Sequence, residues 1–288
     1  MFRTLPRAEK IAGGFQFLEG PVWIPSREEL LFSDIPAGRI HRYGTGQFGV
    51  FREPSGQANG NTLDRDGRLV TCEHGTRRVS RTEPDGTVVP IATHYRGRRL
   101  NSPNDVVCRS DGSIYITDPP YGVTPELREL DFQGVFRIEE TGPPPSAAAP
   151  ADAEGGPQLL VDDFVKPNGL AFSPDEKILY CADTERGHVR AFDVEADGRL
   201  GNGRIFCKVE RPDGMRVDVE GSVWITARTG VKTFDPAGAL VGGIALAEQP
   251  ANLAFGDRDG RTIYITARTG LYRIRVRTPG LSSGAGGV

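Results

Sequence analysis

The chain has 288 residues, a formal net charge of −3 at neutral pH and an isoelectric point near 5.9. No basic stripe runs through the sequence, which argues against nucleic acid and anionic membranes as partners. No apolar run approaches the roughly 18 residues that a membrane-spanning helix needs, and the first 14 residues lack the apolar core of a secretory signal.

The four cysteines are not spaced as a metal site would space them. They are Cys72, Cys108, Cys181 and Cys207. We interpret them as reduced thiols, which predicts a cytoplasmic protein.

Six short apolar segments, rich in β-branched and aromatic residues, predict strands along the whole chain. In order they begin at Leu30 (LLFSD), Leu69 (LVTCE), Ile114 (IYITD), Leu179 (LYCAD), Val223 (VWITA) and Ile263 (IYITA). Most lie roughly 40 to 45 residues apart, which is the repeat length of a β-propeller blade with several short strands.

Turn signals between these segments favour hairpins. The turn pairs are Asp66-Gly67, Asp85-Gly86, Asp111-Gly112, Asp197-Gly198 and Asp259-Gly260. No amphipathic run of helical period exceeds about three turns. The sequence therefore predicts an all-β, six-bladed propeller.

The repeats leave no boundary between domains, so we expect one domain over residues 1–288 with blades from about 12 to 275. Residues near 12–17 should pair with residues 270–276 to close the ring, because an unpaired edge strand invites aggregation. The Pro/Ala/Gly-rich segment 139–157 predicts a surface insertion, and residues 278–288 predict a flexible tail.

A pair whose second residue is Gly-like precedes each strand by ten to twelve positions, and its first residue is polar in the first five repeats. The first residues of these pairs are Glu19, Asn59, Asn104, Asn168, Asp213 and Ala251. Asn-Gly and Asp-Gly pairs are also common turn formers. The shared offset from the strand favours a site instead, because equivalent positions on the innermost strands of a propeller converge at the tunnel entrance.

Carboxylates and amides at this entrance would form a ring of hard oxygen donors without His or Cys. Such a set suits Ca²⁺, with Mg²⁺ or Mn²⁺ as alternatives, better than a metal that prefers thiolates. Two carboxylates would balance a divalent charge, and without a cation they would raise each other's pKa. We therefore predict a metal site in the central tunnel.

Residues near the strand ends are candidates for contact with a substrate. Glu73 and His74 end what we take to be an inner strand near Asn59, and Tyr121 lies in a PPYG turn that could close over the mouth. Asn101 and Met215 are further candidate lining residues.

Several motifs resemble those of the senescence-marker-protein/gluconolactonase/luciferin-regenerating-enzyme-like family, with the bacterial gluconolactonase type as the nearest likeness. They are LEGPVW (18–23), CEHG (72–75), SPNDVV (102–107), TDPPYG (117–122), KPNGLAFSPDEKILY (166–180) and RPDGMRVD (211–218). The resemblance implies a six-bladed propeller with one divalent cation, Ca²⁺ foremost and Zn²⁺ in some members. It assigns Glu19, Asn168 and Asp213 as metal ligands and Asn104 as a ligand or a substrate contact. Animal members carry an Arg where this chain has Ser102.

The chemistry that fits is hydrolysis of a sugar lactone, with the cation as Lewis acid for the ester carbonyl and water as nucleophile. Asp213 and Glu19 are the predicted catalytic carboxylates, with Asp213 as the base. Alternatively, Asp213 is only a ligand and the nucleophile is a hydroxide on the cation. Asn104, Asn59, Glu73, His74, Asn101, Tyr121 and Met215 are the predicted substrate-binding residues.

Two other functions remain open at this point. One is a phosphotriesterase of the diisopropyl-fluorophosphatase kind, which resembles this chain in the same four metal-binding residues. The other is a non-catalytic propeller that binds a ligand or a protein on its face.

Overall fold

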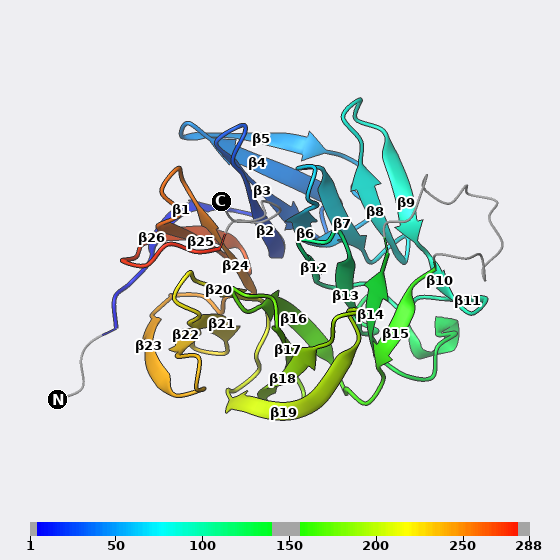
Figure 1. Ribbon diagram of the computed structural model, residues 1–288. Helices are drawn as coiled ribbons and strands as arrows, with labels where there is room; N and C mark the ends of the chain where they lie inside the picture. Colours follow the sequence, from blue (N-terminus) through cyan, green and yellow to red (C-terminus); the bar gives the residue numbers. More distant parts are fainter. Residues whose placement is uncertain (1–4, 140–155, 282–288) are drawn as a thin grey trace.

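The computed structural model describes residues 5–139 and 156–281, and within them six four-stranded antiparallel sheets are arranged around a central axis (Figure 1). We call the sheets blades and give the strands of each from the axis outward. Blade 1 comprises β2 (Leu18–Ile24), β3 (Glu29–Asp34), β4 (Arg39–Gly44) and β5 (Gln47–Arg52). Blade 2 comprises β6 (Ala58–Leu63), β7 (Leu69–Glu73), β8 (Arg78–Thr82) and β9 (Val88–Ala92), and blade 3 comprises β12 (Val106–Cys108), β13 (Ile114–Asp118), β14 (Gly134–Ile138) and β15 (Gln158–Val161).

Blades 4 to 6 continue in chain order. Blade 4 comprises β16 (Pro167–Phe172), β17 (Ile178–Asp183), β18 (His188–Val194) and β19 (Leu200–Lys208). Blade 5 comprises β20 (Met215–Val217), β21 (Val223–Ala227), β22 (Gly230–Phe234) and β23 (Leu240–Ile244). Blade 6 comprises β24 (Asn252–Gly256), β25 (Thr262–Ala267), β26 (Gly270–Arg275) and, as its outermost strand, β1 (Glu9–Gly13). Two short elements lie outside the blades: the hairpin of β10 (His94–Tyr95) with β11 (Arg98–Arg99), and the 3₁₀ turn η1 (Pro125–Leu127). The predicted all-β, six-bladed propeller is confirmed.

Ring closure occurs in blade 6, where β1 pairs antiparallel with β26. Glu9 lies opposite Arg273, and Gly13 lies opposite Gly270. The closing strand was expected near residues 12–17 and begins slightly earlier. Its pairing removes the free edge that β26 would otherwise present.

The core lies between neighbouring blades, which is why the second strand of each blade is buried along almost its whole length. In β3 five of six residues are buried, and β7 and β13 are buried throughout. Tyr115 of blade 3 and Phe172 of blade 4 pack edge to face with ring centroids 5.0 Å apart. Strands covered on both faces read as continuous apolar runs, and these runs are what made the repeat visible in the sequence.

The predicted Asp-Gly turns are present, and each of their glycines has a positive φ, from 64° at Gly260 to 91° at Gly112. Glycine adopts this left-handed conformation without the steric cost that a Cβ brings. The four cysteines are unpaired; Cys108 is only partly buried, and the other three are buried.

Of the predicted insertion 139–157, residues 140–155 lie outside the described part of the chain; the segment joins β14 to β15 within blade 3. Residues 278–281 differ from the expected flexible tail. Gly280 N–H donates to the Gly260 carbonyl at 3.0 Å, and Leu281 N–H donates to the Val217 carbonyl at 3.1 Å. Leu281 also packs against the core beside blade 5. Residues 282–288 lie outside the described residues.

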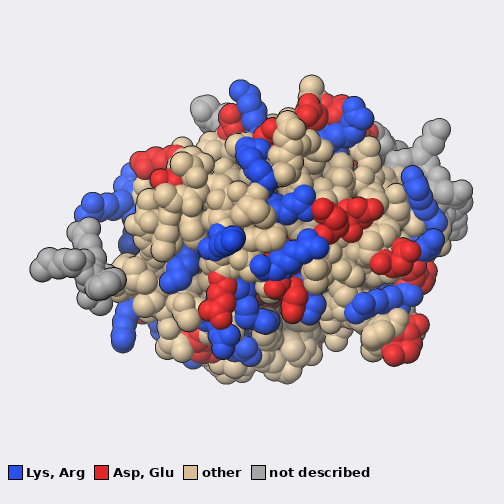
Figure 2. Space-filling model, turned by 90° about the horizontal axis from the view of Figure 1, so that it is seen from below, with Lys and Arg blue, Asp and Glu red and all other residues tan. Residues whose placement is uncertain are grey.

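Acidic and basic side chains are interspersed on the face shown in Figure 2, without a continuous basic stripe. In the residues that the structure describes, there is no helix long and apolar enough to pass through a membrane.

Candidate active site at the tunnel mouth

The predicted ring positions converge at one end of the tunnel, where backbone hydrogen bonds join successive blades. Gly60 N–H donates to the Asn104 carbonyl at 2.8 Å, and Gly169 N–H donates to the Asp213 carbonyl at 3.1 Å. Gly214 N–H donates to the Ala251 carbonyl at 2.8 Å. In each case the residue after one ring position bonds to the next ring position. The ring residues therefore lie side by side around the axis.

Close approach of the inner strands explains the glycine that follows four of the ring positions. A Cβ at Gly20 would lie 1.9 Å from the Asn59 carbonyl oxygen, and one at Gly169 would lie 2.3 Å from that of Asp213. Gly60 and Gly214 are equally crowded, with Cβ contacts of 2.6 and 2.1 Å. No side chain fits at these distances, so the Gly-like second residue of the motif is a packing requirement.

Blades 3 and 6 carry Asp105 and Asn252 where the other blades carry glycine. These blades face each other across the ring, and Asn252 Nδ2 donates to Asp105 Oδ2 at 3.2 Å. Arg216 Nη1 lies 4.0 Å from the same oxygen. This group was not predicted from the sequence, although the second motif position, which reads Gly, Gly, Asp, Gly, Gly and Asn along the chain, carries its signal. The three side chains form a polar floor across the tunnel beneath the ring.

Glu19 and Asp213 are carboxylates held in a buried and negatively charged setting. Burial, Asp213 and Asp105 raise the pKa of Glu19 well above its ordinary value. Burial and Asp105 raise the pKa of Asp213 to about 7. Burial also raises the pKa of Asp105, although Arg216 opposes this shift. Among the described residues neither Glu19 nor Asp213 forms an ion pair with Lys or Arg, so the mouth has an excess of negative charge.

The two amides of the predicted metal set flank these carboxylates. Asn168 Nδ2 donates to Thr184 Oγ1 at 3.0 Å, and that hydroxyl donates to the Pro212 carbonyl at 2.7 Å. Asn104 is buried and occupies the ring position of blade 3. In residues 5–139 and 156–281 no cluster of three or more His, Cys, Asp or Glu side chains is arranged to hold a metal. The candidate set differs from such a cluster because half of its donors are amide oxygens.

Tyr121 lies over blade 4 and blade 5 at the mouth. Burial raises the pKa of Tyr121 to about 12, and the groups that act on its hydroxyl include Thr184, Asp213 and Asn168. Lys166 Nζ lies 5.3 Å from the centre of its ring. The residue is 42% exposed, so it borders the opening and leaves it accessible.

On blade 2 the structure brings Asn59 and His74 together. Asn59 Nδ2 lies 3.0 Å from His74 Nε2, and both residues are buried. His74 follows β7, which is the second strand from the axis and not the inner strand that the sequence analysis assumed.

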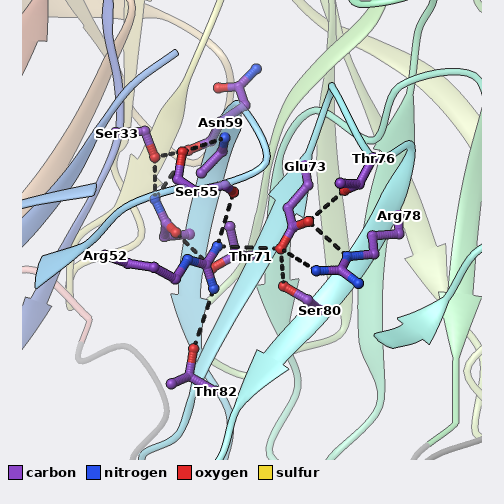
Figure 3. Close-up of polar contacts among 12 residues, drawn as sticks. Ser33, Arg52, Ser55, Asn59, Thr71, Glu73, Thr76, Arg78, Ser80 and Thr82 are labelled. Carbon is purple, nitrogen blue, oxygen red and sulfur yellow. Dashed lines mark hydrogen bonds and ion pairs between the residues drawn. The ribbon is translucent and has the colours of Figure 1, made fainter. Parts of the chain in front are cut away.

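Glu73, by contrast, is bound to other side chains (Figure 3). Its carboxylate accepts hydrogen bonds from Arg78 Nε at 2.7 Å, Ser80 Oγ at 2.5 Å and Arg52 Nη2 at 3.3 Å, and a further one from Thr76. We therefore correct its expected contact with substrate: β7 places it between blade strands, and its oxygens are already satisfied.

Asn101 and Met215 likewise make their contacts within the protein and not at the mouth. Asn101 Nδ2 donates to the carbonyls of Asp118 and Phe132, which fixes the loop before Asn104. Met215 is fully buried and packs in the core between blades 4 and 5. We correct the expectation that either lines the mouth. Sequence spacing placed both near the ring but did not show which way their side chains point.

A separate cleft of about 610 Å³ lies at the junction of blades 6 and 1. It is lined by Trp23 and Tyr264, whose rings stack, and by Arg275 and Asp259, which form an ion pair at 2.5 Å. Trp23 lies near the end of β2, whereas Glu19 lies near its start, so the cleft is remote from the ring.

The family model described as SMP-30/Gluconolactonase/LRE-like region matches residues 17–269, which include every ring position. The chain belongs to this family. It is 33% identical to the gluconolactonase of Zymomonas mobilis, with 94% of this chain and 82% of that protein covered. It is 31% identical to the pentonolactonase XacC of Haloferax volcanii, with 88% and 81% covered.

The fold agrees with solved structures of the family. A gluconolactonase from Xanthomonas campestris superimposes with a TM-score of 0.83 at 34% identity, over 95% of this chain and 90% of that one. Membership of the family therefore rests on both sequence and structure.

Proposed function

We propose that this chain is a metal-dependent hydrolase that opens sugar lactones. The observation that carries the proposal is the pair of buried carboxylates, Glu19 and Asp213. Burial and neighbouring carboxylates raise the pKa of both, and the charge of Arg211 only partly offsets the shift of Asp213. The similarity to a gluconolactonase and a pentonolactonase supports lactones as the substrate class.

A divalent cation fits the residues that are present. Glu19, Asn104, Asn168 and Asp213 would hold it, since they combine two carboxylates with two amide oxygens. Its charge would offset the repulsion that raises the pKa of Glu19. Ca²⁺ is the expected ion, with Zn²⁺, Mn²⁺ or Mg²⁺ as alternatives. When bound, the cation supplies Lewis-acid polarisation of the ester carbonyl and stabilises its developing negative charge.

The chain's own residues supply the remaining steps. The Asp213 carboxylate accepts a proton from the water that attacks the ester carbonyl, as general base, and returns it to the ring oxygen when the acyl C–O bond breaks, which yields the free hydroxy acid. Glu19 is held by a hydrogen bond from Gly20 N–H to Oε2 at 2.9 Å, which orients its carboxylate. The hydrogen bond between Asn252 and Asp105 crosses the tunnel, with Arg216 beside it, so we expect the lactone to enter and the product acid to leave at the ring end.

Asn104, Asn59 and Tyr121 border this mouth and are the proposed substrate contacts, and His74 lies beside them with its ring against the Asn59 amide. The four unpaired cysteines favour a cytoplasmic location, and the interspersed surface charge favours a small-molecule substrate over nucleic acid.

The test is an assay of proton release with D-glucono-1,5-lactone and D-xylono-1,4-lactone, corrected for spontaneous hydrolysis. We expect turnover by the purified protein, loss on chelation, and recovery when Ca²⁺, Mg²⁺, Mn²⁺ or Zn²⁺ is added back singly. Undiminished turnover after complete chelation would contradict the metal requirement. Faster turnover of paraoxon than of any lactone would favour a phosphotriesterase, and inactivity on every ester would favour a binding propeller.

A further inference from the structure

Blade 2 adds a buried imidazole to the mouth, and its hydrogen bond has a defined direction. His74 Nε2 lies 3.0 Å from Asn59 Nδ2. An amide nitrogen can only donate, so the imidazole nitrogen must accept, which requires a neutral ring with its proton on Nδ1. Burial lowers the pKa of His74 to about 4, which keeps the ring neutral at physiological pH.

This bond determines which end of the Asn59 amide is free. With Nδ2 turned toward His74, Oδ1 is directed away from it. Asn59 is 3% exposed as a residue, and its Oδ1 is not one of the described side-chain atoms that are fully buried without a hydrogen-bond partner. An amide oxygen that water can reach can accept a hydrogen bond from a ligand or from water. Asn59 occupies the ring position of blade 2, so that partner approaches through the mouth.

The backbones of both residues are fixed, which keeps the two side chains within hydrogen-bond distance of each other. The Asn59 carbonyl accepts hydrogen bonds from Ser33 Oγ at 2.8 Å and from Asn61 Nδ2 at 3.0 Å. His74 N–H donates to the Gln57 carbonyl at 3.1 Å. The adjacent Glu73 cluster in Figure 3 holds the end of β7 in place.

The turn that carries Tyr121 packs directly on His74. A Cβ at Gly122 would lie 2.6 Å from His74 Cβ, and Gly122 N–H donates to Ser102 Oγ at 2.8 Å. His74 is therefore enclosed between the ring and this turn.

We propose that Asn59 Oδ1 accepts a hydrogen bond from a hydroxyl group of the substrate, and that His74 enforces this preference by holding the amide in one orientation. The inference rests on the proposed lactone activity and narrows the substrate to lactones that carry ring hydroxyls. Asn59 is the binding residue, and His74 is a positioning residue that acts through it. Ser102 Oγ donates its proton to the Pro119 carbonyl at 2.6 Å, so Ser102 does not donate to a substrate hydroxyl. We assign the recognition of that hydroxyl to Asn59 and His74 instead.

The experiment compares D-glucono-1,5-lactone with δ-valerolactone, which has the same ring ester and no hydroxyl. The variants are Asn59→Leu, His74→Phe and His74→Gln, with Thr62→Val on the same strand as control. Phe preserves the ring volume of His74 but accepts no hydrogen bond. The Gln oxygen can accept in place of Nε2. Each variant is loaded with the cation that best supports wild-type turnover, and its metal content is measured.

We expect Asn59→Leu and His74→Phe to lower kcat/KM for gluconolactone about 10-fold, which corresponds to one lost hydrogen bond. Turnover of δ-valerolactone should stay within about 2-fold of wild type. His74→Gln should recover most of the loss, and Thr62→Val should change neither substrate.

Equal losses on both lactones would show a merely structural role and would overturn the inference, as would no loss on gluconolactone. Failure of His74→Gln to recover activity, with His74→Phe impaired, would overturn the positioning role. If the wild type hydrolyses neither lactone, the proposed function itself fails, and the inference fails with it.

Discussion

Glu19 of blade 1 and Glu73 of blade 2 are both buried carboxylates on neighbouring blades, yet their surroundings are opposite. Glu73 accepts hydrogen bonds from two arginines and two hydroxyls. Glu19 is surrounded instead by two further carboxylates, Asp213 and Asp105, which raise its pKa. A buried acid with its counter-charges in place is a structural element. A buried acid whose neighbours repel it is a place where a cation can bind, and this difference locates the proposed site.

The comparison is tested most strongly by Asp213→Asn. Because the variant loses the proposed base while keeping the shape of the side chain, we expect kcat for gluconolactone to fall about 10²- to 10⁴-fold. The measurement is steady-state hydrolysis at saturating cation, with bound metal determined in the same samples. Asp197→Asn, in an exposed turn, is the matched control and should retain activity. Full turnover with normal metal binding would show that Asp213 is not the base.

Substitution of the two glutamates should affect stability in opposite directions. Glu73→Gln leaves Arg52 and Arg78 without a charged partner, so we expect the free energy of unfolding to fall by about 3 kcal/mol. Glu19→Gln relieves repulsion and should stabilise the cation-free protein. Urea unfolding after chelation measures both. A stabilised Glu73→Gln, or a destabilised cation-free Glu19→Gln, would remove the basis of the comparison.

The ring packing is tested by Gly169→Ala. The new Cβ would lie 2.3 Å from the Asp213 carbonyl oxygen, so the inner strands must separate. We expect a loss of about 2 kcal/mol in stability, together with weaker cation binding, because Asp213 moves. Gly242→Ala on β23, where the new Cβ meets nothing within 4 Å, is the control. Equal effects from both substitutions would argue against crowding at the mouth.

The pH dependence of stability tests the charge of Asp213 directly. Asp213 has a folded-state pKa of about 7, raised from an ordinary value of 3.8. Its contribution to stability is therefore fully present below pH 4 and is lost as the pH rises to 7. Between pH 4 and 7 the melting temperature of the cation-free wild type should fall by a few degrees relative to Asp213→Asn. Saturating cation should remove the difference, and parallel curves without cation would contradict the assignment.

The repeat and the ring could be predicted from sequence because both depend on a fixed spacing along the chain. Apolar second strands recur with a polar residue at a fixed offset, and the propeller geometry then brings those residues together. Glu73 and Met215 could not be placed in this way, because the orientation of each depends on partners distant in sequence, such as Arg52 for Glu73 and Val189 for Met215. The first four residues of the expected tail also depend on such contacts, here with Gly260 and Val217.

Asp105 was missed for a different reason. The motif is described by its most frequent second residue, glycine, which draws no attention to the two positions that differ. In the structure these exceptions, Asp105 and Asn252, meet across the axis. Departures from a repeat are therefore as informative as the repeat itself when they fall on opposite blades.

The pairing of β1 with β26 also constrains how the protein is made. Blades 1 to 5 are each contiguous in sequence and can form as they leave the ribosome, whereas blade 6 must wait for β26 to be synthesised before β1 can join it. Non-local pairing of this kind is a slow step in folding. Glu19 follows β1 closely and Asp213 precedes blade 6, so a nascent chain should acquire its ion affinity only after the circle is complete. Metal capture by stalled chains of increasing length would measure that moment.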